Sequence, residues 1–269
     1  MNNRWGNPPY PETLSPAHMA DSDTAADAID AHSGTIMPGT FLTPARDVWN
    51  TSVKPNGKKD QLLLKDALFI LKRDDCHHVI SENYHYKTES YYTILRHELE
   101  GRNVLPSSSA VLDACVVPIC LERAKLAGIP VCEWGISQAY VPLPAILYGL
   151  NYFATTSDFF VVSDNDKAKE AIKHISNKGK YPFCYQKLAE GATILLVNVI
   201  FGRTTNSSTT VASCAKKIYE LFSIPLLQMV FVKTGEHYAL SSLSSTRYSH
   251  LLESERSLLC AYLSHKEFL

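Results

Sequence analysis

Residues 201–243 constrain the fold more than any other stretch, because a helical pattern of apolar residues gives way there to a strand pattern. In its first half, apolar side chains recur every three or four residues, which places them on one face of a helix. They are Ala212, Ala215, Ile218, Tyr219 and Phe222. Pro225 follows shortly afterwards, and a proline disfavours helical geometry at the preceding residue. The pattern therefore predicts a helix that ends within residues 223–225.

Two strands are predicted directly after this helix. Residues 226–232 are a mostly apolar run of strand length, and residues 237–243 form a second run. The polar residues between them include Gly235, and glycine adopts the positive φ of a tight turn at little cost. Together, the helix and the hairpin predict an α/β domain with mixed sheets flanked by helices.

The composition excludes some classes of partner. The 269 residues are 45% hydrophobic and 20% charged, which suffices for one large domain or two small ones. The net charge of -1 provides no strong field to attract nucleic acid or an anionic membrane. No apolar run in the sequence approaches the roughly 18 residues that span a bilayer. We therefore expect neither nucleic acid nor a membrane among the partners of this protein.

The cysteines and the N-terminus indicate a compartment. The seven cysteines are odd in number, form no CxxC pair and mostly lie in apolar runs. Reduced, buried thiols in cytosolic proteins have this distribution. The N-terminal residues lack the apolar core of a signal peptide. Both observations predict a cytoplasmic protein.

Residues 1–60 differ in composition from the rest of the chain. They contain half of the 14 prolines, separated by aspartates, alanines, serines and threonines. Such a segment buries too little apolar surface to offset the entropy lost on ordering. We predict a flexible or loosely packed N-terminal tail over residues 1–60 and a folded α/β domain over residues 61–269.

Apolar patterns predict further elements along the domain. Residues 67–71 suit a buried strand, and residues 88–102 suit a helix. The apolar face of that helix comprises Tyr91, Ile94, Leu95 and Leu99. Residues 111–126 are predicted as one helix, although Pro118 limits where it starts, and residues 129–134 as a strand. The remaining predictions are strands at 159–162, 181–187 and 191–201 and helices at 164–175 and 254–268.

A polar cluster follows the first buried strand. It contains Arg73, Asp74, His77 and His78, and ligands in open α/β sheets gather at such strand ends. We predict these four residues as substrate-binding candidates, with a plain polar loop as the alternative. Within a strand, Cys76 and His78 would share a face while His77 points away, and zinc sites use separated ligand pairs. The cluster therefore predicts no metal site.

Lys187, Arg203 and Arg96 are the candidate contacts for a phosphate or a carboxylate. Lys187 ends a predicted strand, where a lysine either holds a nucleotide phosphate as a point charge or remains solvated. Arg96 lies beside a group of tyrosines that either stacks on a base or forms a half-buried helix face. The sequence contains no glycine-rich phosphate loop and no GxGxxG or GxSxG motif. Motifs alone therefore predict no reaction.

Two stretches carry a resemblance to a known family. Residues 89–107 contain a tyrosine pair, a helix, a glycine, a strand and a proline–serine exit. Residues 200–240 contain Phe201 and Gly202, an aromatic-rich helix, a proline–leucine–leucine strand that begins at Pro225, and its hairpin partner. In this order, the two stretches resemble the N-terminal domain that precedes the catalytic half of RimK-like ATP-grasp ligases. The resemblance extends over residues 60–269.

A looser likeness to the ATP-grasp domain itself lies between these stretches. A glycine–isoleucine–proline sequence at 128–130, the helix at 166–172 and the strand at 181–187 follow the order of that fold. The likeness implies that Lys187 faces the phosphates of ATP. ATP-grasp ligases hold magnesium through an acidic residue on one strand and a late Glu-x-Asn pair, whereas residues 238–243 supply no carboxylate for a hard cation. The resemblance therefore implies an accessory module that assists a ligase and does not catalyse the reaction itself.

Three functions follow from the resemblance. The leading hypothesis is an accessory module that binds a substrate, a carrier peptide or a separate ATP-grasp ligase subunit. The second is a divergent carboxylate–amine ligase that uses ATP and magnesium, passes through an acyl phosphate and has Lys187 on the phosphates. The third is a homo-oligomerisation domain. Magnesium-dependent binding of ATP would favour the divergent ligase, and association with a ligase subunit would favour the accessory module. The cofactor stays unassigned.

Overall fold

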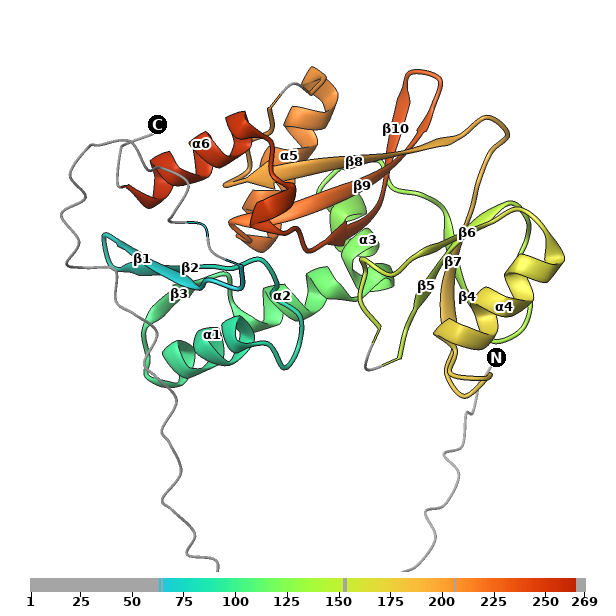
Figure 1. The fold of residues 1–269 in the computed structure, drawn as a ribbon, viewed down its shortest axis with the longest axis horizontal. Coiled ribbons are helices and arrows are strands. Elements are labelled where there is room, and N and C mark those ends of the chain that lie inside the picture. The colour runs from blue at the N-terminus through green and yellow to red at the C-terminus, as the bar shows by residue number, and fades with distance from the viewer. Residues whose placement is uncertain (1–62, 64, 152–153, 206, 265–269) are drawn as a thin grey trace, which may run out of the picture. The chain divides into compact units, whose positions relative to one another are not determined.

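The computed structural model describes residues 63, 65–151, 154–205 and 207–264. All of them belong to one of the two units into which the chain divides, residues 43–269. The tail predicted over residues 1–60 lies outside the described residues, so its boundary stays a prediction. Among the described residues, three sheets and six α-helices form a mixed α/β architecture (Figure 1). The predicted fold class is confirmed.

The first sheet contains a tight hairpin. Its strands are β1 (Phe69–Arg73), β2 (Cys76–Ile80) and β3 (Asn103–Leu105). β1 and β2 pair antiparallel, and β3 pairs parallel to β2. Helix α1 (Glu89–Leu99) connects β2 to β3, and it begins where the Thr88 hydroxyl accepts a hydrogen bond from the backbone of Tyr91. The predicted helix is therefore present, but Leu99 is 81% exposed and does not belong to its buried face.

The segment predicted as one helix over residues 111–126 is in fact two helices. They are α2 (Ser108–Cys115) and α3 (Val117–Leu126). Val116 has an extended backbone that ends the first helix and begins the second. Pro118 lies in the first turn of α3, where a missing N–H breaks no helical hydrogen bond. The prediction was wrong because both helices contact β10, so the apolar pattern continues across the break.

The second sheet is antiparallel throughout, in the order β4-β7-β5-β6. Its strands are β4 (Trp134–Ser137), β5 (Ala145–Gly149), β6 (Phe160–Val162) and β7 (Phe183–Lys187). Helix α4 (Asn165–Ile175) packs on this sheet through Ala168, Ala171 and Ile175, as predicted. The strand predicted over 129–134 was wrong: a strand begins only at Trp134, and Val131 forms an isolated bridge to Leu240.

The third sheet contains the predicted hairpin, in the order β10-β9-β8. Its strands are β8 (Thr193–Ile200), β9 (Leu226–Thr234) and β10 (His237–Ser244). Helix α5 (Thr209–Phe222) links β8 to β9 and ends at Ser223, which adopts a left-handed conformation. The 3-10 helix η3 (Tyr248–His250) and helix α6 (Glu253–Leu263) follow the sheet. The helix–strand–turn–strand prediction for residues 201–243 is confirmed, but Ala212, predicted on the apolar face of the helix, is exposed, and Val211 and Cys214 are buried in its place.

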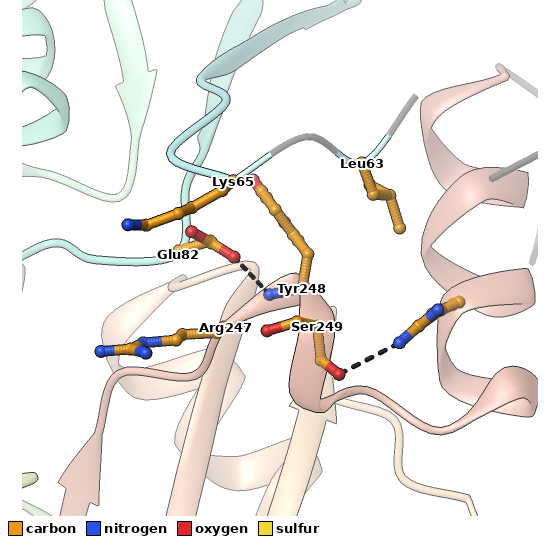
Figure 2. A pocket seen from close by; sticks show the side chains of 7 residues that line it. Leu63, Lys65, Glu82, Arg247, Tyr248 and Ser249 are labelled. Carbon is orange, nitrogen blue, oxygen red and sulfur yellow. Dashed lines mark hydrogen bonds between the residues drawn. The ribbon is translucent and has the colours of Figure 1, made fainter. Parts of the chain in front are cut away.

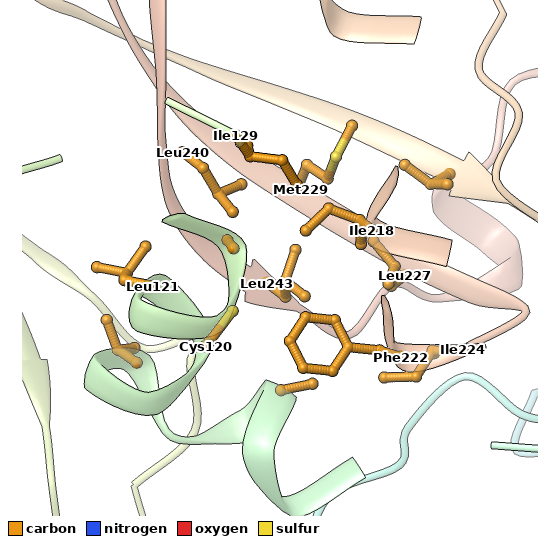
Figure 3. Close-up of a cluster of buried hydrophobic side chains, with 14 of the residues drawn as sticks. Cys120, Leu121, Ile129, Ile218, Phe222, Ile224, Leu227, Met229, Leu240 and Leu243 are labelled. Carbon is orange, nitrogen blue, oxygen red and sulfur yellow. The ribbon is translucent and has the colours of Figure 1, made fainter. Parts of the chain in front are cut away.

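The largest hydrophobic core lies between this third sheet and the helices α3 and α5 (Figure 3). Phe222 from α5 and Leu121 from α3 are fully buried there, together with Met229 of β9 and Leu240 of β10. Burying such side chains stabilises the fold by about 1.5–3 kcal/mol each. Elements that are more than a hundred residues apart in sequence are thereby joined around β9 and β10.

A buried polar network joins the second sheet to β10. The Gln186 side-chain amide donates to the Ser241 carbonyl at 2.7 Å, and the Ser241 hydroxyl donates to the Gln186 carbonyl oxygen at 2.6 Å. The Tyr148 hydroxyl lies 2.7 Å from the same serine hydroxyl and accepts a hydrogen bond from Ser242. Because buried polar groups are costly without partners, this network fixes the end of β7 against β10.

The turn after β8 brings the backbone close to helix α5. Phe201 and Gly202 both have positive φ, +47° and +74°. A Cβ atom added to Gly202 would lie 2.8 Å from the Tyr219 Cβ, closer than carbon atoms approach without displacement. A glycine is therefore required here both by the backbone conformation and by the contact.

Within the described part of the chain, no helix is both long enough and apolar enough to cross a membrane.

Candidate functional site

A pocket of about 360 Å³ lies where the segment before β1, the loop after β2 and the chain around η3 and α6 come together (Figure 2). We call it the Arg247 pocket. It is lined by Leu63, Lys65, Glu82, Arg247, Tyr248, Ser249 and Arg256. Its volume is at the lower end of the range of small-molecule sites. Three of its side chains are cationic and one is a carboxylate.

Glu82 acts as the internal anchor of the pocket. Its side chain is only 6% exposed, and each carboxylate oxygen accepts a hydrogen bond from a backbone N–H. Oε2 accepts from Asp66 at 2.9 Å, and Oε1 accepts from Tyr248. Figure 2 shows the Glu82 carboxylate directed at the backbone of Tyr248. These bonds connect the segment before β1 to η3, so the carboxylate has a structural role.

The cations of the pocket are held differently from one another. The Arg256 guanidinium donates to the backbone carbonyls of Leu251 and Ser249, each at 3.0 Å, so its charge is oriented but not neutralised. The Arg247 side chain is exposed and makes neither a hydrogen bond nor an ion pair with any described residue, although its backbone carbonyl accepts a hydrogen bond from His250. Lys65 lies 3.9 Å from the exposed Asp66 carboxylate, a surface contact that contributes little. Figure 2 shows Lys65 and Arg247 extending in the same direction on either side of Glu82.

The tyrosine beside the pocket adds no negative charge. Burial raises the pKa of Tyr248, and the nearby Tyr84 and Glu82 raise it further. Its hydroxyl donates to the Ala67 carbonyl at 2.9 Å. Tyr248 is therefore neutral at physiological pH, and it serves as a wall of the pocket and a tie to β1.

This arrangement is suited to bind an anion. The only carboxylate lining the pocket already accepts two backbone hydrogen bonds, so it compensates the three cations incompletely. Arginine presents a planar fork of N–H donors that matches a carboxylate or a phosphate, and lysine adds a point charge. The pocket contains no nucleophile beside a base, and no group of three metal-binding side chains occurs among the described residues. Its geometry therefore supports binding of an anionic group.

The predicted substrate-binding cluster lies on the first hairpin and does not line this pocket. Arg73 ends β1, and Asp74 lies in the turn with a φ of +52°; both are exposed. His77 and His78 are neighbours in β2 and face opposite sides. The His77 ring is 5.3 Å from the ring of His97, and the His78 ring is 6.1 Å from that of Phe201. The four side chains do not converge on one cavity, and their role as ligand contacts stays a prediction.

His78 is the most unusual member of that cluster. Its Nδ1 is buried and has no hydrogen-bond partner among the described residues. Burial lowers the pKa of His78, and the positive charges of Arg73 and His77 lower it further. The imidazole is therefore neutral near pH 7, packed against Phe201 and not poised to bind an anion.

The three predicted phosphate or carboxylate contacts lie in three different places. Lys187 is the last residue of β7 and is exposed, beside the buried Gln186. Arg96 is exposed in the last turn of α1. Arg203 lines a second, more open pocket of about 440 Å³. The other lining residues of that pocket are Thr204, Thr205, Ser254, Ser257 and Leu258. The fold does not bring the three cations together, and their binding roles stay predictions.

Sequence reasoning missed the residues that line the Arg247 pocket. Glu82 and Tyr248, which are hydrogen-bonded, are separated by 166 positions in the chain. Arg247 lies between two uncharged residues and Arg256 follows Glu255, and neither belongs to a motif or a repeated spacing. The one available signal was the acidic Glu82, which closely follows the buried end of β2.

Comparison with known proteins gives one match to a family model. Residues 162–261 match the model of the RimK-like ATPgrasp N-terminal domain. The match confirms the resemblance over β8, α5, β9 and β10, whereas the first stretch that carried it, residues 89–107, lies outside the matched range. A comparison with curated protein sequences finds no match.

Three solved structures are similar to part of this chain, each with a TM-score below 0.5. The ATP-grasp ligase PsnB, solved with a phosphomimetic variant of its minimal precursor, Mg and ADP, has a TM-score of 0.47 at 18% identity, over 65% of this chain and 64% of PsnB. A RimK domain ATP-grasp protein from Sphaerobacter thermophilus has a TM-score of 0.49 at 14% identity, over 66% of this chain and 77% of its own. The D-alanine-D-alanine ligase of Helicobacter pylori has a TM-score of 0.49 at 13% identity, over 65% of both chains.

The chain thus spans less than two thirds of the length of PsnB. The likeness to the RimK-like ATPgrasp N-terminal domain rests on the sequence match over residues 162–261, which is less than half of the chain.

Proposed function

Proceeding from the match of residues 162–261 to the RimK-like ATPgrasp N-terminal domain, we propose that this chain is a binding module that works with an ATP-grasp-type carboxylate–amine ligase. Its role is to hold a carboxylate-bearing ligand, an amino acid or a peptide, in the Arg247 pocket. A separate ligase chain then forms the amide bond.

The observation that carries this proposal is the uncompensated positive charge of the pocket. Lys65, Arg247 and Arg256 line one cavity, and the only carboxylate among the lining residues is occupied by two backbone N–H groups. The substrate of a carboxylate–amine ligase carries a carboxylate, and arginine is the side chain that binds this group in a defined orientation. The pocket provides recognition without a catalytic group.

The chemistry of the third sheet supports a helper over a catalyst. ATP-grasp ligases need carboxylate oxygens to hold magnesium, because a hard cation prefers oxygen ligands that carry charge. Strands β8, β9 and β10 contain no aspartate or glutamate. The donor set on this sheet therefore does not fit a magnesium–nucleotide complex.

One observation favours the divergent ligase as a second candidate. Lys187 is exposed at the end of β7, and the preceding Gln186 is bonded to Ser241 of β10. The lysine is thus held at a junction between two sheets, a suitable position for a phosphate contact. In this role Lys187 would contact a phosphate of the nucleotide.

Calorimetric titration of the purified chain tests the proposal. The probes are a short alanine peptide with a free C-terminal carboxylate and the same peptide with an amidated C-terminus. We expect binding of the first only, and we expect Arg247→Gln to weaken it about tenfold or more, the effect of losing one charge-assisted hydrogen-bonded contact. Arg96→Gln is the matched control, because Arg96 is also an exposed arginine and lies outside the pocket.

The outcomes separate the candidates. Equal affinity for the two peptides, or a loss caused by Arg96→Gln and not by Arg247→Gln, would contradict carboxylate binding in the Arg247 pocket. ATP with magnesium, titrated into the same protein, gives heat of binding only if the divergent-ligase alternative holds.

A further inference from the structure

Strand β8 forms an open edge of the third sheet. The order of that sheet is β10-β9-β8, so β8 pairs with a strand on one side only; Figure 1 shows it running beside β9. The opposite edge, β10, is covered, because Leu240 exchanges backbone hydrogen bonds with Pro130 and Cys132. Only one edge of this sheet is therefore closed by main chain from elsewhere in the described residues.

The backbone hydrogen bonds show which groups of β8 point outward. The N–H and C=O of Ile200 both bond to Arg203, each at 2.9 Å, whereas the N–H of Phe201 bonds to Pro225, at the start of β9. Backbone groups alternate in direction along a strand. The N–H and C=O of Ile194, Leu196 and Asn198 therefore point away from β9. Among the described residues, none of these six groups has a backbone partner.

The side chains of this edge lack the usual protection against pairing. Natural edge strands carry charges, prolines or bulges that prevent other strands from adding. β8 reads TILLVNVI and has no charge, proline or glycine, whereas β1 ends with Lys72 and Arg73. Leu195 and Leu196, which point to opposite faces, are 37% and 50% exposed. An added strand would cover both leucines and bond to the outward backbone groups.

We propose that the occupant of this edge is β8 of a second copy of the same chain, added antiparallel about a two-fold axis at Leu196. In this register Leu196 pairs with Leu196 of the partner subunit, and Ile194 pairs with Asn198 of the partner subunit. Each copy uses all three of its outward N–H groups and all three of its outward C=O groups. The product is a continuous sheet with β8 of both copies at its centre.

The length and the lack of charge of the accessible part of β8 favour a second copy of this chain over an unrelated strand. Arg203 closes the edge at Ile200, which leaves residues 194–198 accessible. This window has the same length on both sides of Leu196, so it matches itself in the antiparallel direction without an overhang. Because it contains no charge, self-pairing brings no like charges together. A closed two-fold contact also ends after two copies and does not propagate.

Charge substitutions at Leu196 test this pairing. In the proposed register, the two Leu196 side chains lie directly opposite, with Cβ atoms about 5 Å apart. Leu196→Lys and Leu196→Glu each place like charges there, and each should raise the dissociation constant of the dimer about tenfold or more. An equimolar mixture of the two variants should restore dimerisation, because opposite charges then meet. Val161→Lys is the matched control, since Val161 on β6 is 51% exposed.

Sedimentation equilibrium of the full chain, at concentrations up to about 100 µM, gives the readout. The proposal is overturned if the parent chain is a monomer. It is also overturned if the dimer tolerates both single variants, or if the mixed variants fail to associate while each keeps a native circular dichroism spectrum. Should either variant fail to fold, Leu196→Pro replaces it, because the N–H that proline lacks is one of the outward groups of this edge and bonds to no residue of β9; a dimer that tolerates this change refutes the pairing. None of these residues lines the Arg247 pocket, so the result is independent of the peptide titration.

Discussion

Replacing Gly202 by alanine, and comparing the result with the same change at Gly101, isolates the contact between the turn after β8 and helix α5. The two glycines have nearly identical positive φ angles, +74° and +73°. Their surroundings differ. A Cβ atom at Gly202 would lie 2.8 Å from the Cβ of Tyr219, whereas a Cβ atom at Gly101 would meet nothing within 4 Å. The pair therefore shares the backbone strain and differs in the steric contact.

The expected magnitudes follow from these two terms. An L-residue in the left-handed region costs about 1–2 kcal/mol, and this cost applies at both positions. At Gly202 the added methyl group also has to displace Tyr219, whose ring packs against Phe201 at 6.0 Å between centroids. Overpacking of this kind costs about 1–3 kcal/mol. We expect Gly202→Ala to lose about 2 kcal/mol more unfolding free energy than Gly101→Ala.

Urea unfolding monitored by circular dichroism measures both losses. Equal destabilisation by the two variants would refute the close contact with Tyr219. A second check uses Tyr219→Gly in the Gly202→Ala background, because this change removes the Cβ atom that the added methyl group would meet at 2.8 Å, together with the ring atoms behind it. The two substitutions should then be less destabilising together than the sum of their separate effects.

Three further outcomes are expected. Glu82→Gln should lower the unfolding free energy by about 1.5–3 kcal/mol in urea unfolding, because an amide in place of the carboxylate can accept only one of the two backbone bonds from Asp66 and Tyr248; unchanged stability would contradict the anchoring role. Burial lowers the pKa of His78 in the folded state, whereas in the unfolded chain the pKa of this histidine is about 6.5. Below that pH the unfolded chain binds more protons than the folded one, so the unfolding free energy should fall as the pH drops, and it should fall less steeply in His78→Phe. Parallel pH profiles of the two proteins would exclude His78 as the cause. Lys187→Ala should weaken any binding of ATP in calorimetry while leaving the fold intact, and an unchanged affinity would remove this exposed residue from a nucleotide site.

Local sequence patterns predicted the elements around the functional region well where each pattern depends on neighbours in the chain. The face of α5 follows from apolar spacing, and Gly235 and Pro225 mark the ends of β9. The break between α2 and α3 at Val116 was not predictable in this way, because both helices contact β10 and keep one apolar pattern. Spacing reports the buried face of an element and not its continuity.

The residues of the candidate site, in contrast, could not be predicted from local sequence patterns. Lys187 and Arg203 were identified as candidate phosphate or carboxylate contacts, and the structure places them in separate regions. The Arg247 pocket was not identified, because its cations and Glu82 belong to segments more than 160 positions apart in the chain. A single cation in a loop carries no pattern until folding brings a second one beside it.

By itself, the sequence determined the α/β character of the chain, the helix and hairpin of residues 201–243 and the resemblance to the RimK-like domain, since periodicity, turn residues and short motifs are properties of consecutive residues. Only the tertiary structure decided which cations share a cavity, which glycine meets a ring and which edge of β8 has no partner. These features depend on distances between segments that are remote in the chain, and packing of the whole domain sets those distances.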